Sequence, residues 1–175
     1  MTTTFENLIA TVPDYPVPGV MFRDFTPALA DRQAFSEIID HISENFIKRG
    51  VTKVMGAESR GFILGAPVSL RLNAGFIPAR KPGKLPRVGY SCYYDLEYGR
   101  DGLELPEGAL EADDVVLIID DLLATGGTAA AMGTMVKEAG AQIAGYAFFA
   151  ELKDLPGREK IAEVTDAEIF SLVEL

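Results

Sequence analysis

The chain centres on the segment Val115-Val116-Leu117-Ile118-Ile119-Asp120-Asp121-Leu122-Leu123-Ala124-Thr125-Gly126-Gly127-Thr128. Its first five residues are aliphatic, and such a run predicts a strand that is buried on both faces, as in a parallel sheet. We expect this strand to end at the two carboxylates, before a loop of Thr and Gly that leads into a helix. Backbone N–H groups of such a loop and the dipole of the following helix attract anions, whereas adjacent carboxylates suit sugar hydroxyls or a hard cation. The segment therefore predicts a site that binds a phosphate at one end and a diol at the other.

Length and composition place the chain among globular proteins. At 175 residues, with 48% hydrophobic and 24% charged residues, we expect a single domain over residues 1–175. No run approaches the ~20 apolar residues of a membrane span, and the first residues lack the basic start and apolar region of a secretory signal. The single cysteine, Cys92, cannot form an internal disulfide, which fits a reducing compartment. We therefore expect a cytoplasmic protein, and we assign no chemical role to Cys92 or to the single histidine, His41.

The charge of the chain is unevenly distributed. Its net value of −10 argues against nucleic acid as the main partner. Residues 59–94 nevertheless contain no Asp or Glu and six of the sixteen basic residues, namely Arg60, Arg71, Arg80, Lys81, Lys84 and Arg87. One interpretation of this basic block is a solvated face that arose by chance. We favour the other, a local positive site for a small polyanion that the remaining surface would repel.

Helical and extended segments alternate along the chain. Apolar periodicity, with Gly and Pro at the boundaries, predicts helices at 5–12, 31–50, 61–73 and 128–139, and a brief helix or turn at 157–162. It predicts strands at 51–57, 75–79, 115–119, 143–151 and 167–173, a hairpin arm at 91–105, and irregular loops at 14–27 and 80–86. We expect the loop at 80–86 to be mobile, with its charges directed outward. The alternation predicts an α/β fold whose central parallel β-sheet is flanked by helices, with the turns after the strands meeting at one edge.

Several of these segments together resemble a known family, the type I phosphoribosyltransferases, and within it the adenine-specific enzymes. The segment 115–128 resembles the family's motif for binding phosphoribosyl pyrophosphate (PRPP). The supporting segments are Asp14-Tyr15-Pro16-Val17-Pro18-Gly19-Val20-Met21-Phe22-Arg23-Asp24, Ser59-Arg60-Gly61-Phe62, Arg80-Lys81-Pro82-Gly83-Lys84-Leu85-Pro86 and Tyr94-Asp95-Leu96-Glu97-Tyr98-Gly99. The resemblance implies a small N-terminal hood at 1–30, an α/β core at 31–175, and a flexible loop and catalytic arm at about 81–105.

The resemblance also implies roles for individual residues on PRPP. The ribose hydroxyls would be held by Asp120 and Asp121, directly or through Mg²⁺ that is carried mainly by PRPP. The 5′-phosphate would be bound by Ala124, Thr125, Gly126, Gly127 and Thr128. The pyrophosphate side would comprise Glu58, Ser59, Arg60, Lys81 and Lys84, with Arg80 beside them. In relatives the turn at Glu58 and Ser59 often contains a cis peptide bond, which the sequence does not reveal.

Catalysis and base recognition are assigned to further residues by the same resemblance. Glu97 would carry out the proton transfer to or from the base, while Arg60 and Lys81 would stabilise the departing pyrophosphate. Adenine would be recognised by Val20, Met21, Phe22 and Arg23 in the proline-rich N-terminal loop.

The implied activity is Mg²⁺-dependent transfer of the phosphoribosyl group from PRPP to adenine, giving AMP and pyrophosphate, in purine salvage. The resemblance further implies a homodimer, with no nucleic-acid or membrane partner. Two alternatives remain at this point. One is a phosphoribosyltransferase for another purine base, xanthine or hypoxanthine/guanine; the other is a regulator that senses PRPP and binds DNA, for which the chain offers little basic surface.

Overall fold

The computed structural model describes residues 5–96 and 99–175. Their contacts separate into two compact units, one that ends at His41 and one that comprises Ile42–Leu175. Each unit is described by itself. The helix α2 (Arg32–Phe46) runs from the first unit into the second.

The first unit contains a small antiparallel hairpin. The 3-10 turn η1 (Glu6–Leu8) leads to β1 (Ala10–Pro13), which pairs with β2 (Met21–Asp24), and α1 (Thr26–Ala30) follows. The predicted helix at 5–12 is therefore wrong beyond its first turn, and the predicted loop at 14–27 contains a strand. β-Branched residues at 11–12 and Pro13 favour extended backbone, and the cross-strand pairing decides the outcome.

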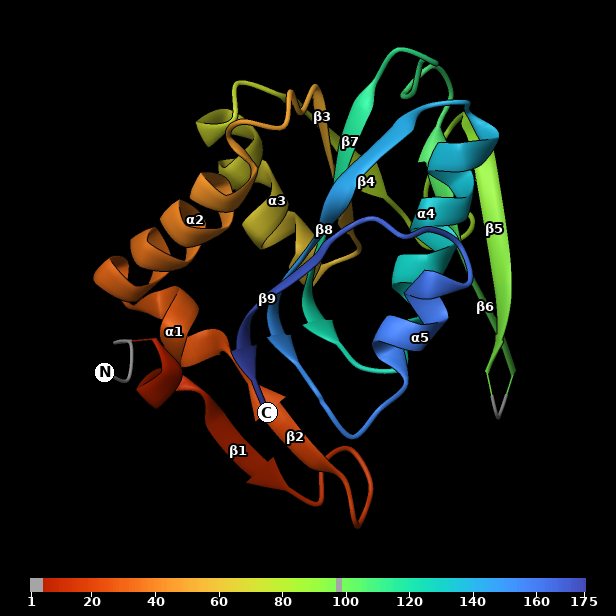
Figure 1. Ribbon diagram of the computed structural model, residues 1–175. Helices are drawn as coiled ribbons and strands as arrows, with labels where there is room; N and C mark the ends of the chain where they lie inside the picture. Colours follow the sequence, from red (N-terminus) through yellow and green to blue (C-terminus); the bar gives the residue numbers. More distant parts are fainter. Residues whose placement is uncertain (1–4, 97–98) are drawn as a thin grey trace. The chain divides into compact units, whose positions relative to one another are not determined.

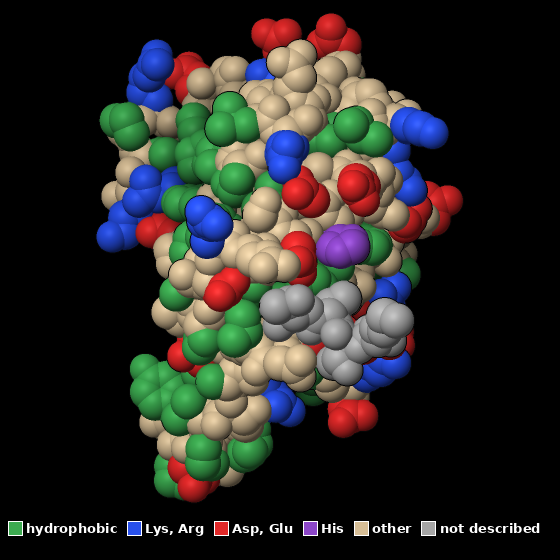
Figure 2. Space-filling view, turned by 90° about the vertical axis from the view of Figure 1, so that its left-hand side faces the viewer, with side chains coloured by type: hydrophobic (Ala, Val, Ile, Leu, Met, Phe, Trp, Pro, Cys, Tyr) green, Lys and Arg blue, Asp and Glu red, His purple; other side chains and the backbone are tan. Residues whose placement is uncertain are grey.

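The helix α2 begins one residue after the predicted start at 31 and ends at Phe46, four residues before the predicted end at 50. The Asp31 carboxylate accepts hydrogen bonds from the N–H groups of Gln33 (2.9 Å) and Ala34 (2.8 Å), which satisfies two donors of the first turn. His41 on this helix is exposed and is the purple side chain in Figure 2. Its ring meets the edge of Phe5 with centroids 6.0 Å apart.

In the described part of the second unit, a five-stranded parallel sheet forms the centre (Figure 1). Its strands lie in the order β4 (Gly75–Ala79), β3 (Lys53–Ala57), β7 (Val115–Leu123), β8 (Gln142–Glu151) and β9 (Ile169–Glu174). The aliphatic run is the middle strand, and all four residues from Val116 to Ile119 have an exposed fraction of 0%. The predicted central parallel sheet is confirmed.

Helices cover both faces of this sheet. In Figure 1, α3 (Arg60–Arg71) lies on one side, and α4 (Gly127–Glu138) with α5 (Gly157–Ala162) lies on the other. The core between the sheet and α4 is built from apolar side chains such as Met132, Met135 and Phe148, each at most 1% exposed. Among the described residues, no helix has the length and apolar character needed to cross a membrane.

The strand β7 extends further than expected. We predicted its end at Ile119, before the acid pair, but it continues to Leu123 because β8 runs alongside it, with Asp120 opposite Phe148 and Leu122 opposite Ala150. The two carboxylates are thus held by the sheet itself and not by a loop.

A second hairpin forms the predicted arm. Strand β5 (Val88–Leu96) pairs antiparallel with β6 (Gly99–Pro106), so the arm begins three residues earlier and ends one residue later than predicted. The loop that precedes it, at 80–86, is irregular as predicted, but a bridge between Arg80 and Glu104 fastens its first residue to β6. The arm is thereby connected to the end of β4.

Candidate active site

A cavity of about 250 Å³ opens at the carboxyl ends of β3, β4 and β7. Its lining consists of Glu58, Arg60, Lys81, Leu103, Asp120, Asp121, Leu122, Ala124 and Thr128. A second cavity, of about 80 Å³, is lined mainly by the loop between β7 and α4 and includes every residue from Leu122 to Ala129. Both linings include Asp120 and Thr128. The structure therefore brings together the residues at the turns after three strands, as predicted for one edge of a parallel sheet.

The shape of the loop at 124–128 depends on Gly126 within it and on Gly157, which packs against it. Gly126 has a φ of +79° and precedes the first turn of α4. Its carbonyl accepts a hydrogen bond from the N–H of Ala130 at 2.8 Å, which starts the helix. Gly157 packs so closely that a Cβ on Gly126 would stand 2.5 Å from the Gly157 carbonyl oxygen. A tight loop ahead of a helix N-terminus leaves its N–H groups available to an anion.

The acid pair lies in an environment that disfavours two negative charges. The Asp121 N–H donates to the Asp120 carboxylate at 2.9 Å, and Asp121 is only 6% exposed. Burial raises the pKa of Asp120 well above its ordinary value, and the adjacent charge of Asp121 adds to this. Burial also raises the pKa of Asp121, although the Arg60 guanidinium opposes the shift. A partner that donates hydrogen bonds or carries positive charge would therefore stabilise the ionised form of both carboxylates.

Arg60 reaches this pair from the start of α3. Its Nε lies 2.8 Å from Asp121 Oδ2, in an ion pair. The approach depends on Gly61, because a Cβ there would stand 2.9 Å from the carbonyl oxygen of Ile119 on β7. The absence of a side chain thus allows the first turn of α3 to lie against the strand that carries the acids.

Glu58 holds the loop after β4 in place. Its carboxylate accepts hydrogen bonds from Arg80 Nε (2.9 Å) and from the backbone N–H of Lys81 (2.8 Å), which lower the pKa of Glu58. The peptide bond between Glu58 and Ser59 is cis, a feature that the sequence did not reveal. Because Glu58 is negatively charged, it is suited to orienting the basic residues and not to contacting an anion.

Four of the six cations in the basic block form ion pairs with acids from outside its own segment. Arg60 pairs with Asp121, Arg80 with Glu58, Lys81 with Asp101, and Arg87 with Glu107. The expectation that the charges at 80–86 point outward is wrong for Arg80 and Lys81, which are half-buried in these pairs. The described residues that line the two cavities include neither Ser59 nor Lys84, and both are exposed.

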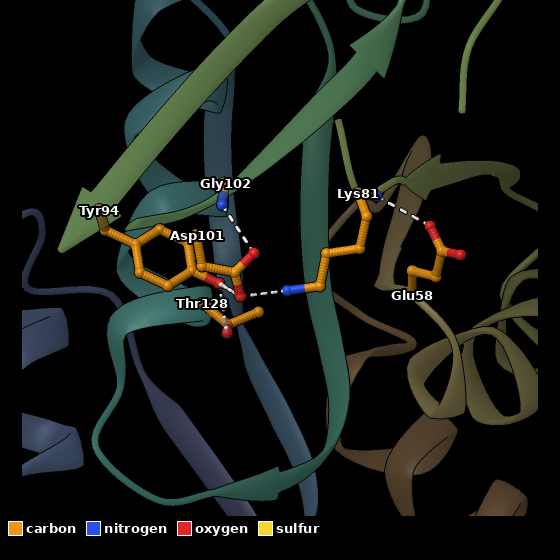
Figure 3. A network of polar contacts seen from close by, with 6 residues as sticks. All are labelled: Glu58, Lys81, Tyr94, Asp101, Gly102 and Thr128. Atoms are coloured by element: carbon orange, nitrogen blue, oxygen red, sulfur yellow. Dashed lines mark hydrogen bonds and ion pairs between the residues drawn. The ribbon is translucent and has the colours of Figure 1, made fainter. Parts of the chain in front are cut away.

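The arm contributes residues that the sequence did not indicate. Asp101 on β6 and Tyr94 on β5 are cross-strand partners, and Figure 3 shows the Asp101 carboxylate between Lys81 and Tyr94, with Thr128 beside the Tyr94 hydroxyl. Cross-strand pairs share one face of a hairpin, so the register of the arm, had it been known, would have placed Asp101 beside Tyr94. Glu97, the predicted proton-transfer residue, lies outside the described residues.

The residues predicted to recognise adenine lie in the first unit. Met21, Phe22 and Arg23 are on β2, and Val20 precedes it. Phe22 meets the Tyr15 ring edge-on at 5.1 Å, and Arg23 donates a hydrogen bond to Thr11 Oγ1 at 2.5 Å. Val20 and Met21 are exposed. Their role in base recognition stays a prediction.

Substitution of Asp120 by Asn tests whether the buried negative charge of Asp120 lowers the stability of the fold. The raised pKa means that the folded state binds the Asp120 proton more tightly, so stability falls as the pH rises from the ordinary value of 3.8 through the raised pKa. Asn keeps the acceptor for the Asp121 N–H but carries no charge. We expect the variant to gain about 1 kcal/mol in the free energy of unfolding at pH 8, or about 2–4 °C in Tm, and to lose this gain near pH 4.

Asp121→Asn is the matched control for this measurement. It also removes a buried negative charge, but it breaks the ion pair with Arg60, so we expect no gain in Tm. Thermal unfolding of both variants and the parent between pH 4 and pH 8 gives the comparison. Equal stabilisation by both substitutions, or none by either, contradicts the assignment.

Comparison with known proteins identifies the class that this fold and site define. The family model for the phosphoribosyl transferase domain matches residues 28–171, a range that contains the whole sheet up to β9 and the linings of both cavities. The chain belongs to the phosphoribosyltransferase family and has its fold.

The relatives narrow this class further. The adenine phosphoribosyltransferase of Colwellia psychrerythraea is 52% identical over 96% of this chain and 92% of its own length. That of Thermosynechococcus vestitus is 50% identical over 91% and 94% of the two chains. The chain belongs to the adenine phosphoribosyltransferase family.

Solved structures agree with this assignment. The crystal structure of adenine phosphoribosyltransferase from Thermoanaerobacter pseudethanolicus superposes with a TM-score of 0.92 at 40% identity, covering 98% of both chains. The Saccharomyces cerevisiae enzyme, crystallised with adenine and an imino-altritol bisphosphate, has a TM-score of 0.88 at 37% identity over 96% of each chain.

Proposed function

We propose that this enzyme transfers the 5-phosphoribosyl group from PRPP to adenine, releasing AMP and pyrophosphate, and so serves purine salvage. The observation that carries the proposal is the cavity of about 250 Å³, whose lining combines an acid pair, two cationic side chains and the start of an anion-binding loop. These are the chemical groups that a phosphorylated sugar with a pyrophosphate at C1′ requires. The adenine present in the yeast relative's crystals supports the choice of base.

The ribose 5-phosphate half of PRPP fits the loop and the acids. N–H groups at 124–128 and the hydroxyls of Thr125 and Thr128 would bind the 5′-phosphate. Asp120 and Asp121 would accept hydrogen bonds from the 2′- and 3′-hydroxyls, which reduces the cost of keeping both carboxylates ionised. The substrate would then be held on the sheet and on α4, both rigid elements, while the bond at C1′ breaks.

The pyrophosphate half fits the cationic side of the cavity. Cleavage of the C1′–O bond leaves positive charge on the sugar and adds negative charge to the leaving group. Arg60 and Lys81 would stabilise that anion, with Ser59 and Lys84 in supporting positions, since preorganised donors act on charge that develops in the transition state. Glu58 would keep Lys81 and Arg80 in place through the hydrogen bonds described above.

The residues also fit a Mg²⁺ ion that is held mainly by PRPP. No group of three His, Cys, Asp or Glu side chains in the described part of the chain forms a metal cage. Mg²⁺ often binds one or two carboxylates together with substrate phosphates. Burial raises the pKa of Asp120, so its ionised form is disfavoured, and a nearby cation would stabilise that form. Asp120 and Asp121 would hold the ion indirectly, and it would supply further charge neutralisation to the pyrophosphate.

Base recognition and proton transfer complete the proposal. Val20, Met21, Phe22 and Arg23 would bind adenine, and Glu97 would exchange a proton with the base as one of its ring nitrogens attacks C1′. Both assignments rest on the sequence motifs.

A panel of bases tests the activity directly. The protein is incubated with PRPP and Mg²⁺ and with adenine, hypoxanthine, guanine or xanthine in turn, and the nucleotide formed is identified by chromatography. We expect AMP from adenine and no nucleotide from the oxopurines. A product from hypoxanthine, guanine or xanthine but not from adenine overturns the base assignment, and PRPP binding without consumption of any base overturns the enzymatic one.

The assembly and location belong to the same proposal. We expect a homodimer in the cytoplasm without a nucleic-acid partner, as the family and the net charge of −10 suggest. Sedimentation velocity at micromolar concentration measures the assembly. A single species with the mass of one 18.9 kDa chain contradicts the dimer.

A further inference from the structure

A hydrogen-bonded network joins the arm to Lys81 and Thr128, two residues that line the cavity (Figure 3). Asp101 on β6 forms an ion pair with the Lys81 ammonium. The Tyr94 hydroxyl on β5 lies 3.2 Å from the same carboxylate and 3.0 Å from Thr128 Oγ1 at the start of α4. Lys81 and Thr128 both line the cavity, whereas Asp101 and Tyr94 are not among the described lining residues.

The Asp101 carboxylate is fixed before it meets Lys81. One of its oxygens accepts a hydrogen bond from the N–H of Gly102 at 2.8 Å, so the other is directed at Lys81 and Tyr94. Burial opposes ionisation, but the hydrogen bond from Lys81 and that from Gly102 outweigh it and lower the pKa of Asp101. Asp101 is therefore a charged group that the arm presents to Lys81.

The backbone of Lys81 is held separately from its side chain. Its N–H donates to Glu58 at 2.8 Å, on the side of β3. The side chain alone pairs with Asp101, and it is 39% exposed. Lys81 can thus exchange its anionic partner by rotation of its side chain, while the loop stays in place.

The network also determines the direction of the Thr128 proton. A phenol carries one proton. When Tyr94 donates that proton to Asp101, its oxygen can only accept from Thr128, so the Thr128 hydroxyl donates toward the arm and not toward a phosphate. A single carboxylate on the arm thereby engages two groups that the proposed function assigns to PRPP.

We propose that Asp101 is a positioning residue that occupies the anion partners of the cavity before substrate binds. It holds the Lys81 ammonium directly and the Thr128 hydroxyl through Tyr94, and phosphate oxygens displace it from both. This inference rests on the proposed function, because it takes the displacing group to be the phosphates of PRPP or of the pyrophosphate product. It predicts that Asp101 weakens binding of those anions and speeds their release.

The test compares pyrophosphate affinities by isothermal titration calorimetry with inorganic pyrophosphate and Mg²⁺. Asp101→Asn keeps the shape of the side chain but not its charge, so Lys81 loses its competing anion. We expect this variant to bind pyrophosphate about fivefold more tightly than the parent, the ratio typical of one partly exposed ion pair. Unchanged or weaker binding by a folded Asp101→Asn variant overturns the proposal.

Two further variants separate this effect from simple charge and from structural damage. Glu107→Gln removes one negative charge at the other end of the arm, where Glu107 pairs with Arg87 outside the cavity lining, and we expect the parent affinity within about 1.5-fold. Asp101→Glu restores the charge, and we expect it to restore affinity toward the parent value. Equal tightening by Glu107→Gln and Asp101→Asn would attribute the effect to net charge and overturn the proposal.

Tyr94→Phe provides an independent measurement. It removes the link from Asp101 to Thr128 but leaves the ion pair with Lys81, so we expect tighter binding of ribose 5-phosphate and unchanged binding of pyrophosphate. The reverse pattern contradicts the role of Tyr94. A parent protein that binds pyrophosphate but consumes no base in the panel assay refutes the proposed function alone, since the exchange at Lys81 is still measured by these affinities.

Discussion

Replacement of Glu97 by Gln is expected to lower kcat by about 100- to 10,000-fold, the usual contribution of a general acid or base. The motif Leu96-Glu97-Tyr98-Gly99 motivates this prediction. Adenine must lose a proton from one ring nitrogen as another forms the bond to C1′, and Gln cannot accept it. Because Gln has nearly the shape of Glu, we expect PRPP affinity to change by less than about threefold.

Steady-state kinetics with adenine and PRPP, together with calorimetric PRPP binding, measure both quantities. Glu107→Gln again serves as the control for loss of one negative charge, and its kcat should stay close to that of the parent. Retention of full kcat by Glu97→Gln would remove Glu97 from the mechanism. A parallel loss of PRPP affinity would instead assign Glu97 to substrate binding.

Replacement of Gly126 by Ala is expected to cost about 2 to 4 kcal/mol in the free energy of unfolding. The backbone of Gly126 has a φ of +79°, a conformation that an Ala residue rarely adopts. The added Cβ would also stand 2.5 Å from the Gly157 carbonyl oxygen and 3.0 Å from Lys160 Cβ. Neither the backbone of Gly157 nor that of the loop can move without disturbing the first turn of α5 or of α4.

The same change should weaken phosphate binding. If the loop shifts by a few tenths of an ångström, at least one N–H group no longer points at the 5′-phosphate. Loss of one hydrogen bond to a charged group corresponds to at least about a tenfold loss of affinity for ribose 5-phosphate. Thermal unfolding measures the first effect, and calorimetry on the remaining folded protein measures the second.

Gly127 provides the matched control for Gly126→Ala. A Cβ at Gly127 would meet the Tyr94 ring at 3.4 Å, an ordinary contact, and Gly127 begins α4. Ala there restricts the unfolded chain, so we expect a change in stability within about 1 kcal/mol, in the favourable direction. If both variants have the same Tm, the strain and close contact at Gly126 do not govern the loop.

The sequence predicted the core of this fold because hydrophobic burial acts on long, regular segments. The aliphatic run at 115–119 could be stable only with both faces covered, and the structure gives each of Val116 to Ile119 an exposed fraction of 0%. The strand predicted at 75–79 and the helix or turn predicted at 157–162 have the observed bounds, and each begins at a glycine. The short first unit was predicted less well, because its β1–β2 pairing depends on contacts between residues about ten positions apart.

The sequence also predicted which residues form the candidate site, but it did not predict which of the acidic and basic side chains form ion pairs with one another. The loop at 124–128, the acid pair, Arg60 and Lys81 were all expected at one edge of the sheet, because parallel strands bring their carboxyl ends together. Which carboxylate meets which cation depends on positions set only after folding. Lys81 pairs with Asp101 because β6 returns beside it, twenty residues further along the chain.

What the sequence determined alone is therefore the parallel sheet and the set of charged groups at its edge, both consequences of local pattern. The segment at 115–128 carries the strand, the acid pair and the Thr-Gly loop in sequence order. The tertiary structure decided that the acids lie within β7 and that Arg60 forms an ion pair with Asp121. It also placed the arm's Asp101 on Lys81, because side-chain pairing depends on the register of a hairpin and the packing of distant elements.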